Sequence, residues 1–427
     1  MNPETTVDIA YGKGRLRLEL DRKLAEWRVI RPKFEPPLPN PHAVFDEVCR
    51  APIGSRPLRG VVDAKDRVVI VTSDGTRPVP NNLLLPWLLE ELPVPLDQVT
   101  VLIGTGTHRG NTDDELRSMF GADLSRQVRF VNHDASDPAQ NVEIGRTETG
   151  VPITLNAEYV HADKRIVLGF IEPHFFAGFS GGPKGVIPGI AGLDTIFHIH
   201  GYDLIAHPQS TWGILTENPL QRAIADMVAL CPPDFLVNVS LNSEKNITGV
   251  FAGHYIEAHR AGCAHVRETA MIPVPHKFPV VVTSNSGYPL DQNLYQTVKG
   301  MSAAARITED DSAIFAASEC SDGIPAHGNF GAVLQRHETV ASVDSWLQQL
   351  ASPVQDQWQI QTLVQILKRS KVYLHSQLAP ECVRACKLAP ISSLELGLRE
   401  HIETIGRGAP VAVLPEGPVT IPYCQES

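Results

Sequence analysis

Three short segments carry side chains that could do chemistry, and each follows a run of β-branched or other apolar residues. DGTRP contains Asp74 and Arg77, GTGTHR contains His108, and HFFAGFSGGPKG contains His174 and Lys184. Arginine suits two-point binding of a phosphate or carboxylate, and histidine can take and give a proton near neutrality. Taken singly, DGTRP is also typical of a turn that begins a helix, and a lone loop histidine is more often structural.

The segment HFFAGFSGGPKGVIPGI, residues 174–190, places one histidine and one lysine among glycines and prolines. We expect the glycines of SGG to let the backbone approach a ligand closely, and Pro183 and Pro188 to restrict the loop. A lysine confined in this way can lose its proton and act as a nucleophile. A salt-bridged surface lysine is the ordinary alternative, so the pattern of Lys184 alone leaves both interpretations open.

Two further pairs have suggestive spacing. His198 and His200 form an HxH pair in TIFHIHG, but on a helix they point to different faces, so we expect one of them to bind a metal. Gln296 and Lys299 are three residues apart in a helical pattern and share one face, where a cation and an amide donor could hold a carboxylate. A solvated helix face is the alternative for this second pair.

The elements that must position these side chains are strands alternating with helices. Residues 67–73, 99–106 and 165–170 are predicted strands, and residues 81–92 and 113–121 are predicted helices. This alternation predicts an α/β fold with largely parallel sheets covered by helices. Ligands bind beyond the carboxyl ends of parallel strands, so the three polar loops should lie at one edge of one sheet.

The length of 427 residues predicts two domains. We place them at residues 1–271 and 272–427, with a proline-spaced linker around residues 272–279, and expect the active site in a cleft between them. A net charge of −11 argues against nucleic acid as the main partner. There is no membrane-length apolar run or secretory signal, and the seven scattered cysteines predict reduced thiols, so we expect a cytoplasmic protein.

Taken together and in order, these motifs resemble the nickel-dependent lactate racemase family. The resemblance rests on DGTRP, GTGTHR, HFFAGFSGGPK with His200 sixteen residues beyond Lys184, and YQTVKG. It extends to IAYGKGRLRLEL near the start, to residues 235–262 and to ASECSDG at residues 317–323. Each motif is weak alone, but the ordered combination covers most of the chain.

The resemblance implies a nickel pincer nucleotide, nickel-pyridinium-3,5-bisthiocarboxylic acid mononucleotide, made by separate cofactor-synthesis proteins. It would be attached covalently to Lys184, with His200 as the protein ligand of Ni(II). The loop Asp74, Gly75, Thr76 and Arg77 would contact this cofactor.

By the same resemblance, His108 and His174 would be the acid–base pair of a racemase or epimerase that moves a hydride reversibly from C2 of a 2-hydroxy acid to the cofactor. Arg77, Gln296 and Lys299 would hold this small-molecule substrate. Segment 321–333 departs from the acidic, glycine-rich stretch that the family leads us to expect, which leaves the choice among lactate, malate, longer acids and sugar acids open.

Other functions remain possible at this point. A metal-dependent hydrolase could use His108, His174 and His200 around a zinc-bound water, but Lys184 would then have no role. A non-enzymatic carrier of the nucleotide would not need the two acid–base histidines. A nicotinamide dehydrogenase is disfavoured because GTGTHR lacks the third glycine of the dinucleotide fingerprint.

Overall fold

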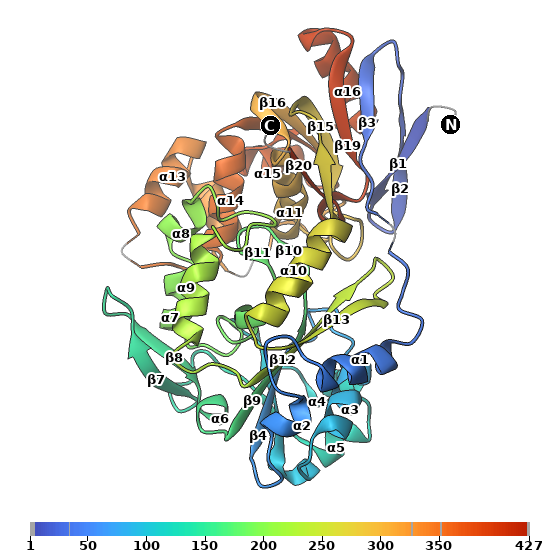
Figure 1. Cartoon of the computed structure of the whole chain (residues 1–427). Helices are drawn as coiled ribbons and strands as arrows, with labels where there is room; N and C mark the ends of the chain where they lie inside the picture. The colour runs from blue at the N-terminus through green and yellow to red at the C-terminus, as the bar shows by residue number, and fades with distance from the viewer. Residues whose placement is uncertain (1–4, 34, 326–327, 351, 425–427) are drawn as a thin grey trace. The chain divides into compact units, whose positions relative to one another are not determined.

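A computed structural model describes residues 5–33, 35–325, 328–350 and 352–424 of the chain (Figure 1). The chain forms two compact units. The N-terminal unit comprises Phe34–Ile199 and Pro208–Arg267, and the C-terminal unit comprises Met1–Lys33, His200–His207 and Glu268–Ser427. Each unit is built on a six-stranded sheet with helices packed against it, which confirms the predicted α/β class with largely parallel sheets.

The sheet of the N-terminal unit has the order β13-β12-β9-β4-β5-β6, in which only β13 runs antiparallel to its neighbour. Its strands are β4 (Val68–Ser73), β5 (Val99–Gly104), β6 (Arg129–Asn132), β9 (Lys164–Phe170), β12 (Phe235–Leu241) and β13 (Ile247–Gly253). Most of their β-branched residues are buried, as expected for strands covered on both faces. The predicted strands at residues 67–73, 99–106 and 165–170 are confirmed as β4, β5 and β9.

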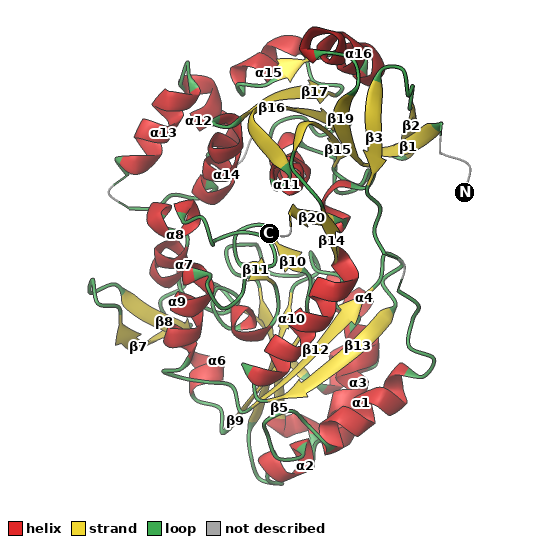
Figure 2. Cartoon of the chain, turned by 45° about the horizontal axis from the view of Figure 1, so that its top comes forward, coloured by secondary structure: helices red, strands yellow, loops and turns green. Residues whose placement is uncertain are grey.

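The two faces of this sheet are covered differently. Helices α1 to α4 gather on one side of it, where Ile166 and Leu168 of β9 join their apolar core (Figures 1 and 2). Val167, between them, points to the other face and lies against Gly185 of the 3-10 turn η2. The remaining elements of the unit are α1 (Pro41–Arg50), α2 (Leu58–Val61), α3 (Asn81–Glu91), η1 (Leu96–Gln98), α4 (Asp113–Phe120), α5 (Leu124–Gln127), β7 (Asn141–Arg146), β8 (Pro152–Asn156), α6 (Ala157–Val160), β10 (Pro173–His174), β11 (Gly178–Phe179), η2 (Gly182–Gly185), α7 (Leu193–Ile199), α9 (Pro219–Val228) and α10 (Glu257–Ala270).

The C-terminal unit has a parallel sheet with the order β18-β17-β16-β15-β19-β3. Its edge strand β3 comes from the start of the chain and pairs with β19, so a single cut after residue 271 does not separate the two compact units. The elements are β1 (Thr6–Tyr11), β2 (Gly14–Glu19), β3 (Ala25–Val29), α8 (Tyr202–Ala206), β14 (Met271–Val274), β15 (Phe278–Ser284), α11 (Leu294–Ala305), β16 (Thr308–Ala317), α12 (Phe330–Arg336), α13 (Val340–Gln348), α14 (Gln357–Leu367), β17 (Ser370–His375), α15 (Pro380–Ala385), β18 (Ala389–Pro390), α16 (Leu394–Ile405), β19 (Ala409–Leu414), η3 (Gly417–Val419) and β20 (Ile421–Cys424).

The segment expected to be an open linker, residues 272–279, is structured instead. Its first part forms β14, which pairs in parallel with β20 near the end of the chain, and β15 begins at Phe278. The alternating apolar residues of this segment outweigh its prolines. Among the described helices, none is long and apolar enough to cross a membrane.

Candidate active site

The three polar loops leave neighbouring strands at one edge of the N-terminal sheet, as predicted. The chain runs from the central strand β4 outward through β5 and β6, and then returns to β9 and β12 on the other side of β4. The order of strands therefore reverses between β4 and β9. In parallel α/β sheets this is the place where a crevice for a ligand forms, and the loops that carry Asp74 and His174 leave the two strands beside it.

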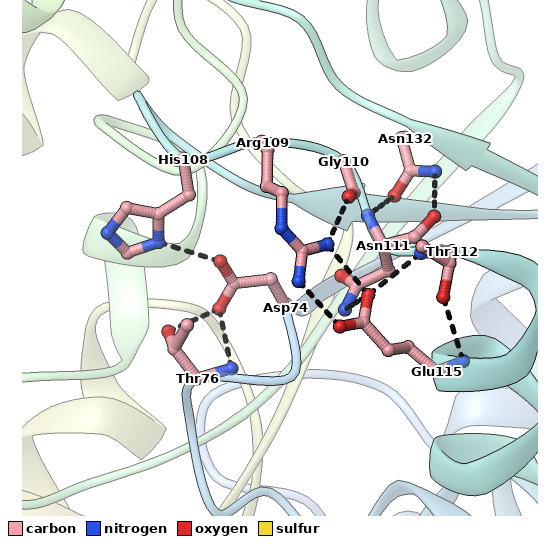
Figure 3. A network of polar contacts seen from close by, with 9 residues as sticks. All are labelled: Asp74, Thr76, His108, Arg109, Gly110, Asn111, Thr112, Glu115 and Asn132. Carbon is pink, nitrogen blue, oxygen red and sulfur yellow. Dashed lines mark hydrogen bonds and ion pairs between the residues drawn. The ribbon is translucent and has the colours of Figure 1, made fainter.

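Asp74 and His108, from adjacent loops, form a close pair (Figure 3). His108 Nδ1 lies 2.7 Å from Asp74 Oδ2, and the backbone N–H and hydroxyl of Thr76 donate to Oδ1 at 3.1 and 2.6 Å. Burial raises the pKa of the Asp74 carboxyl, but the hydrogen bonds from His108 and Thr76 outweigh burial, and this pKa lies below its ordinary value. An ionised carboxylate only accepts, so Nδ1 of His108 carries a proton, and in the neutral form of the ring Nε2 keeps a lone pair.

The loop after His108 is folded onto the first turn of α4. Arg109 makes a two-point ion pair with Glu115, at 2.9 and 2.7 Å, and Thr112 and Glu115 form a capping box (Figure 3). The pKa of Glu115 is lowered to about 2, mainly by the hydrogen bond from Arg109. These contacts escaped the sequence-based prediction of the site, although the T-x-x-E spacing of the capping box was a readable signal.

A hollow of about 300 Å³ opens beside the Asp74–His108 pair. Gly75 and Thr76 are exposed and Arg77 is half-buried. The hollow is lined by Asp74, Gly75, Thr76, His108, Arg109, Asn111, Glu115, Ser118 and Met119. The predicted cofactor-contacting loop and one predicted acid–base histidine therefore border the same space.

His174 is the last residue of β10, which forms a small hairpin with β11. The backbone N–H of Ala177 donates to its Nδ1 at 3.2 Å. Phe175 stacks on the imidazole at a centroid distance of 4.9 Å, and Phe176 meets it edge-on at 4.5 Å. Because Nδ1 accepts, the neutral ring carries its proton on Nε2, which is the reverse of the arrangement at His108.

Lys184 lies in η2, where Pro183 separates it from two glycines with left-handed backbone angles, Gly181 at φ 76° and Gly182 at φ 58°. A Cβ at Gly181 would lie 2.6 Å from Asn238 Oδ1, and one at Gly182 would lie 2.4 Å from the His259 ring. In the Cβ direction these glycines permit a close approach to protein groups, and the expectation that the loop also approaches a ligand stays a prediction.

The other predicted site residues belong to the C-terminal unit. His200 directly follows α7, is 7% exposed, and contacts the Trp358 ring at a centroid distance of 4.6 Å. Gln296 and Lys299 are half-buried and lie on one face of α11, as their spacing predicted. His198 is in the last turn of α7, so the HxH pair is not on one regular helix.

Both halves of the chain match models of known domains. Residues 11–213 match the lactate racemase N-terminal domain, and residues 275–421 match the lactate racemase C-terminal domain. The chain belongs to the lactate racemase family. It is therefore an enzyme of the isomerase class. Its relatives support racemase activity on a small molecule.

Relatives in the lactate racemase family match along nearly the whole chain. The lactate racemase of Thermoanaerobacterium thermosaccharolyticum is 36% identical over 422 residues, covering 96% of this chain and 97% of that protein. The lactate racemase of Lactiplantibacillus plantarum is 34% identical over 377 residues, covering 86% and 87%. A solved structure of the T. thermosaccharolyticum lactate racemase apoprotein superposes with a TM-score of 0.89 at 33% identity, covering 99% of this chain and 100% of that one.

Proposed function

We propose that this protein racemises or epimerises a 2-hydroxy acid, lactate or a related 2-hydroxycarboxylate, with His108 and His174 as the acid–base pair. The observation that carries the proposal is that the Nδ1 atoms of the two rings have opposite hydrogen-bond partners. Nδ1 of His108 donates to Asp74, whereas Nδ1 of His174 accepts from the backbone of Ala177. A racemase needs a group that takes the hydroxyl proton and a second group that can bond to the oxygen in the other arrangement, and the two histidines offer an acceptor and a hydrogen-bond donor.

The chemistry of each ring follows from its partner. The lone pair on His108 Nε2 can take the proton of a C2 hydroxyl, and the resulting imidazolium would face the ionised Asp74 carboxylate at 2.7 Å. His174, with Nδ1 occupied by the Ala177 N–H, presents Nε2–H as a hydrogen-bond donor to the substrate oxygen. Asp74 thus gains a role in orienting His108, beside the cofactor contact that the family resemblance implies.

The substrate carboxylate requires cationic and amide donors, which other residues supply. Arg77 follows the Asp74 turn, and Lys299 and Gln296 share one half-buried face of α11. A guanidinium binds a carboxylate at two points, and an ammonium beside an amide donor binds it through charge and a hydrogen bond. We assign substrate binding to these three residues.

Lys184 and His200 fit the attachment and metal-ligand roles for a nickel pincer nucleotide. An imidazole such as that of His200 is a plausible ligand for Ni(II), and the family resemblance assigns the attachment to Lys184. Asp74, Gly75 and Thr76 border the hollow where the nucleotide would make contact, and Arg77 follows them in the same loop. When bound, the cofactor would supply a reversible acceptor for the hydride of C2.

The decisive experiment is intact mass and metal analysis of protein produced together with the cofactor-synthesis proteins, followed by chiral chromatography of a panel of 2-hydroxy acids. The expected result is an adduct of mononucleotide size, stoichiometric nickel, and conversion of either enantiomer of one substrate to a mixture. Unmodified protein with stoichiometric zinc, beside an active control racemase made in the same way, would instead favour the hydrolase.

A further inference from the structure

The loop that carries both His174 and Lys184 is held by buried polar side chains from three other elements. Each of these side chains bonds to the loop backbone rather than to another side chain of the site. They are Asn218, Gln221, Asn238 and His259, with exposed fractions of 0%, 5%, 0% and 3%. Buried polar groups are costly unless paired, so these contacts define one loop conformation.

The first two side chains hold the hairpin β10–β11. Asn218, the N-cap of α9, donates from Nδ2 to the Phe176 carbonyl at 2.9 Å. Gln221 donates from Nε2 to the carbonyls of Ala177 and Phe179, at 2.6 and 2.9 Å. These carbonyls belong to the turn and the second strand of the hairpin that contains the acid–base histidine.

The other two side chains hold the turn that leads into the lysine. Asn238 of β12 accepts from the Gly182 backbone N–H through Oδ1 at 2.8 Å. His259 of α10 donates from Nε2 to the Ser180 carbonyl at 2.8 Å, and its ring closely approaches Gly182. Burial lowers the pKa of His259 to about 4, so at neutral pH the ring is uncharged and its single proton is on the nitrogen that faces Ser180.

We propose that these four residues are positioning residues, and that each pair of them holds one part of the loop for a separate task. Asn218 and Gln221 set the imidazole of His174 for proton transfer, whereas Asn238 and His259 set the amine of Lys184 for attachment of the nucleotide. The proposal rests on the roles assigned above to His174 and Lys184. It implies that attachment and turnover can be impaired separately.

His259→Leu tests the lysine half. The variant keeps an apolar side chain in the site but removes the donor to Ser180, so we expect nucleotide attachment, measured by intact mass after co-production, to fall at least about tenfold. His259→Gln carries an amide that can reach Ser180 and should restore attachment. His133→Leu is the matched control, because His133 is also buried and contacts the Ala191 carbonyl, and it should leave attachment unchanged.

Gln221→Met tests the histidine half. Methionine has a similar length and no donor, so we expect normal attachment by mass. Once the rate is corrected for attached nucleotide, kcat should fall about 10- to 100-fold with little change in KM. The two variants thus serve as controls for each other.

The proposal is overturned if folded His259→Leu attaches nucleotide as fully as the unchanged protein, or if Gln221→Met loses attachment while keeping its kcat. Circular dichroism and the melting temperature establish folding. If His259→Leu does not fold, His259→Asn replaces it, since its shorter amide does not reach Ser180, and undiminished attachment there has the same meaning. If the protein without any substitution carries no nucleotide after co-production, the proposed function itself is refuted, and this outcome is distinct from failure of the positioning proposal.

Discussion

The two candidate acid–base histidines lie in loops that follow the strands on either side of β4, but they are controlled by different forces. The His108 side chain is 51% exposed and is held by a buried carboxylate, whereas His174 is half-buried, packed by two phenylalanines and bonded to backbone. Charge fixes the first ring, and packing with a rigid loop fixes the second. Two groups with the same assigned task should therefore respond differently to the same kind of change.

Removing either ring should have the largest effect. We expect His108→Ala and His174→Ala each to lower the racemisation rate by about 10²- to 10⁴-fold, which is the usual contribution of a general acid or base. Intact mass should show the nucleotide still attached, because neither ring is expected to hold it. Full activity in either variant would remove that histidine from the mechanism.

Replacing the charge that faces His108 should have the next largest effect. Asp74→Asn keeps the size of the side chain but loses the carboxylate that orients Nδ1–H and stabilises an imidazolium, so we expect kcat to fall about 10²-fold. The pH profile of kcat should change as well. If Asp74→Asn loses the nucleotide but keeps its rate per attached cofactor, Asp74 acts on the cofactor and not on His108.

Loosening the packing around His174 should have a smaller effect. Phe175→Leu removes the stacked ring but leaves the hairpin and its backbone bonds, and an aromatic contact of this kind contributes about 0.5–1.5 kcal/mol. We expect kcat to fall by less than about tenfold, since 1.4 kcal/mol corresponds to a factor of ten. A loss as large as that of Asp74→Asn would mean that packing controls His174 as strongly as charge controls His108.

Acid should weaken the two regions in different pH ranges. His259, under the His174–Lys184 loop, has its pKa lowered by burial from 6.5 to about 4, so the unfolded chain binds a proton that the folded chain does not. The free energy of unfolding should therefore fall as the pH drops from about 6.5 to about 4, and His259→Gln should flatten this slope. The pKa of Asp74 is lowered from 3.8, so its contribution is present above 3.8 and is lost below that value.

Urea denaturation at several pH values measures the free energy of unfolding in both pH ranges. A slope between pH 6.5 and 4 that is identical with and without His259 would show that this ring does not set the acid stability of its loop.

The strands and loops that position the site could largely be predicted from the sequence, because the residue patterns that indicate them are local. The apolar runs that form β4, β5 and β9 predicted the sheet, and the rule for parallel strands then brought the three polar loops to one edge. Helix α4 was predicted with its end at Gly121, which has a φ of 87°.

The contacts that tune the site could not be predicted, because they join residues far apart in the chain. Nothing near Asp74 indicates that its partner is His108. The role of the glycines before Lys184 depends on Asn238 and His259, which come from β12 and α10. An asparagine in the middle of the apolar run FLVNVSL was a visible anomaly, but only the fold shows what it binds.

The pairing of β3 with β19 has a consequence for the synthesis of the chain. Residues Ala25–Val29 are synthesised long before Ala409–Leu414, against which they pair. During translation the N-terminal sheet can fold before β19, the partner strand of β3, has been synthesised. A fragment that begins after β3 would expose the edge of β19 to pairing with other chains. Expression of the C-terminal half alone should therefore favour aggregation unless the first thirty or so residues are supplied with it.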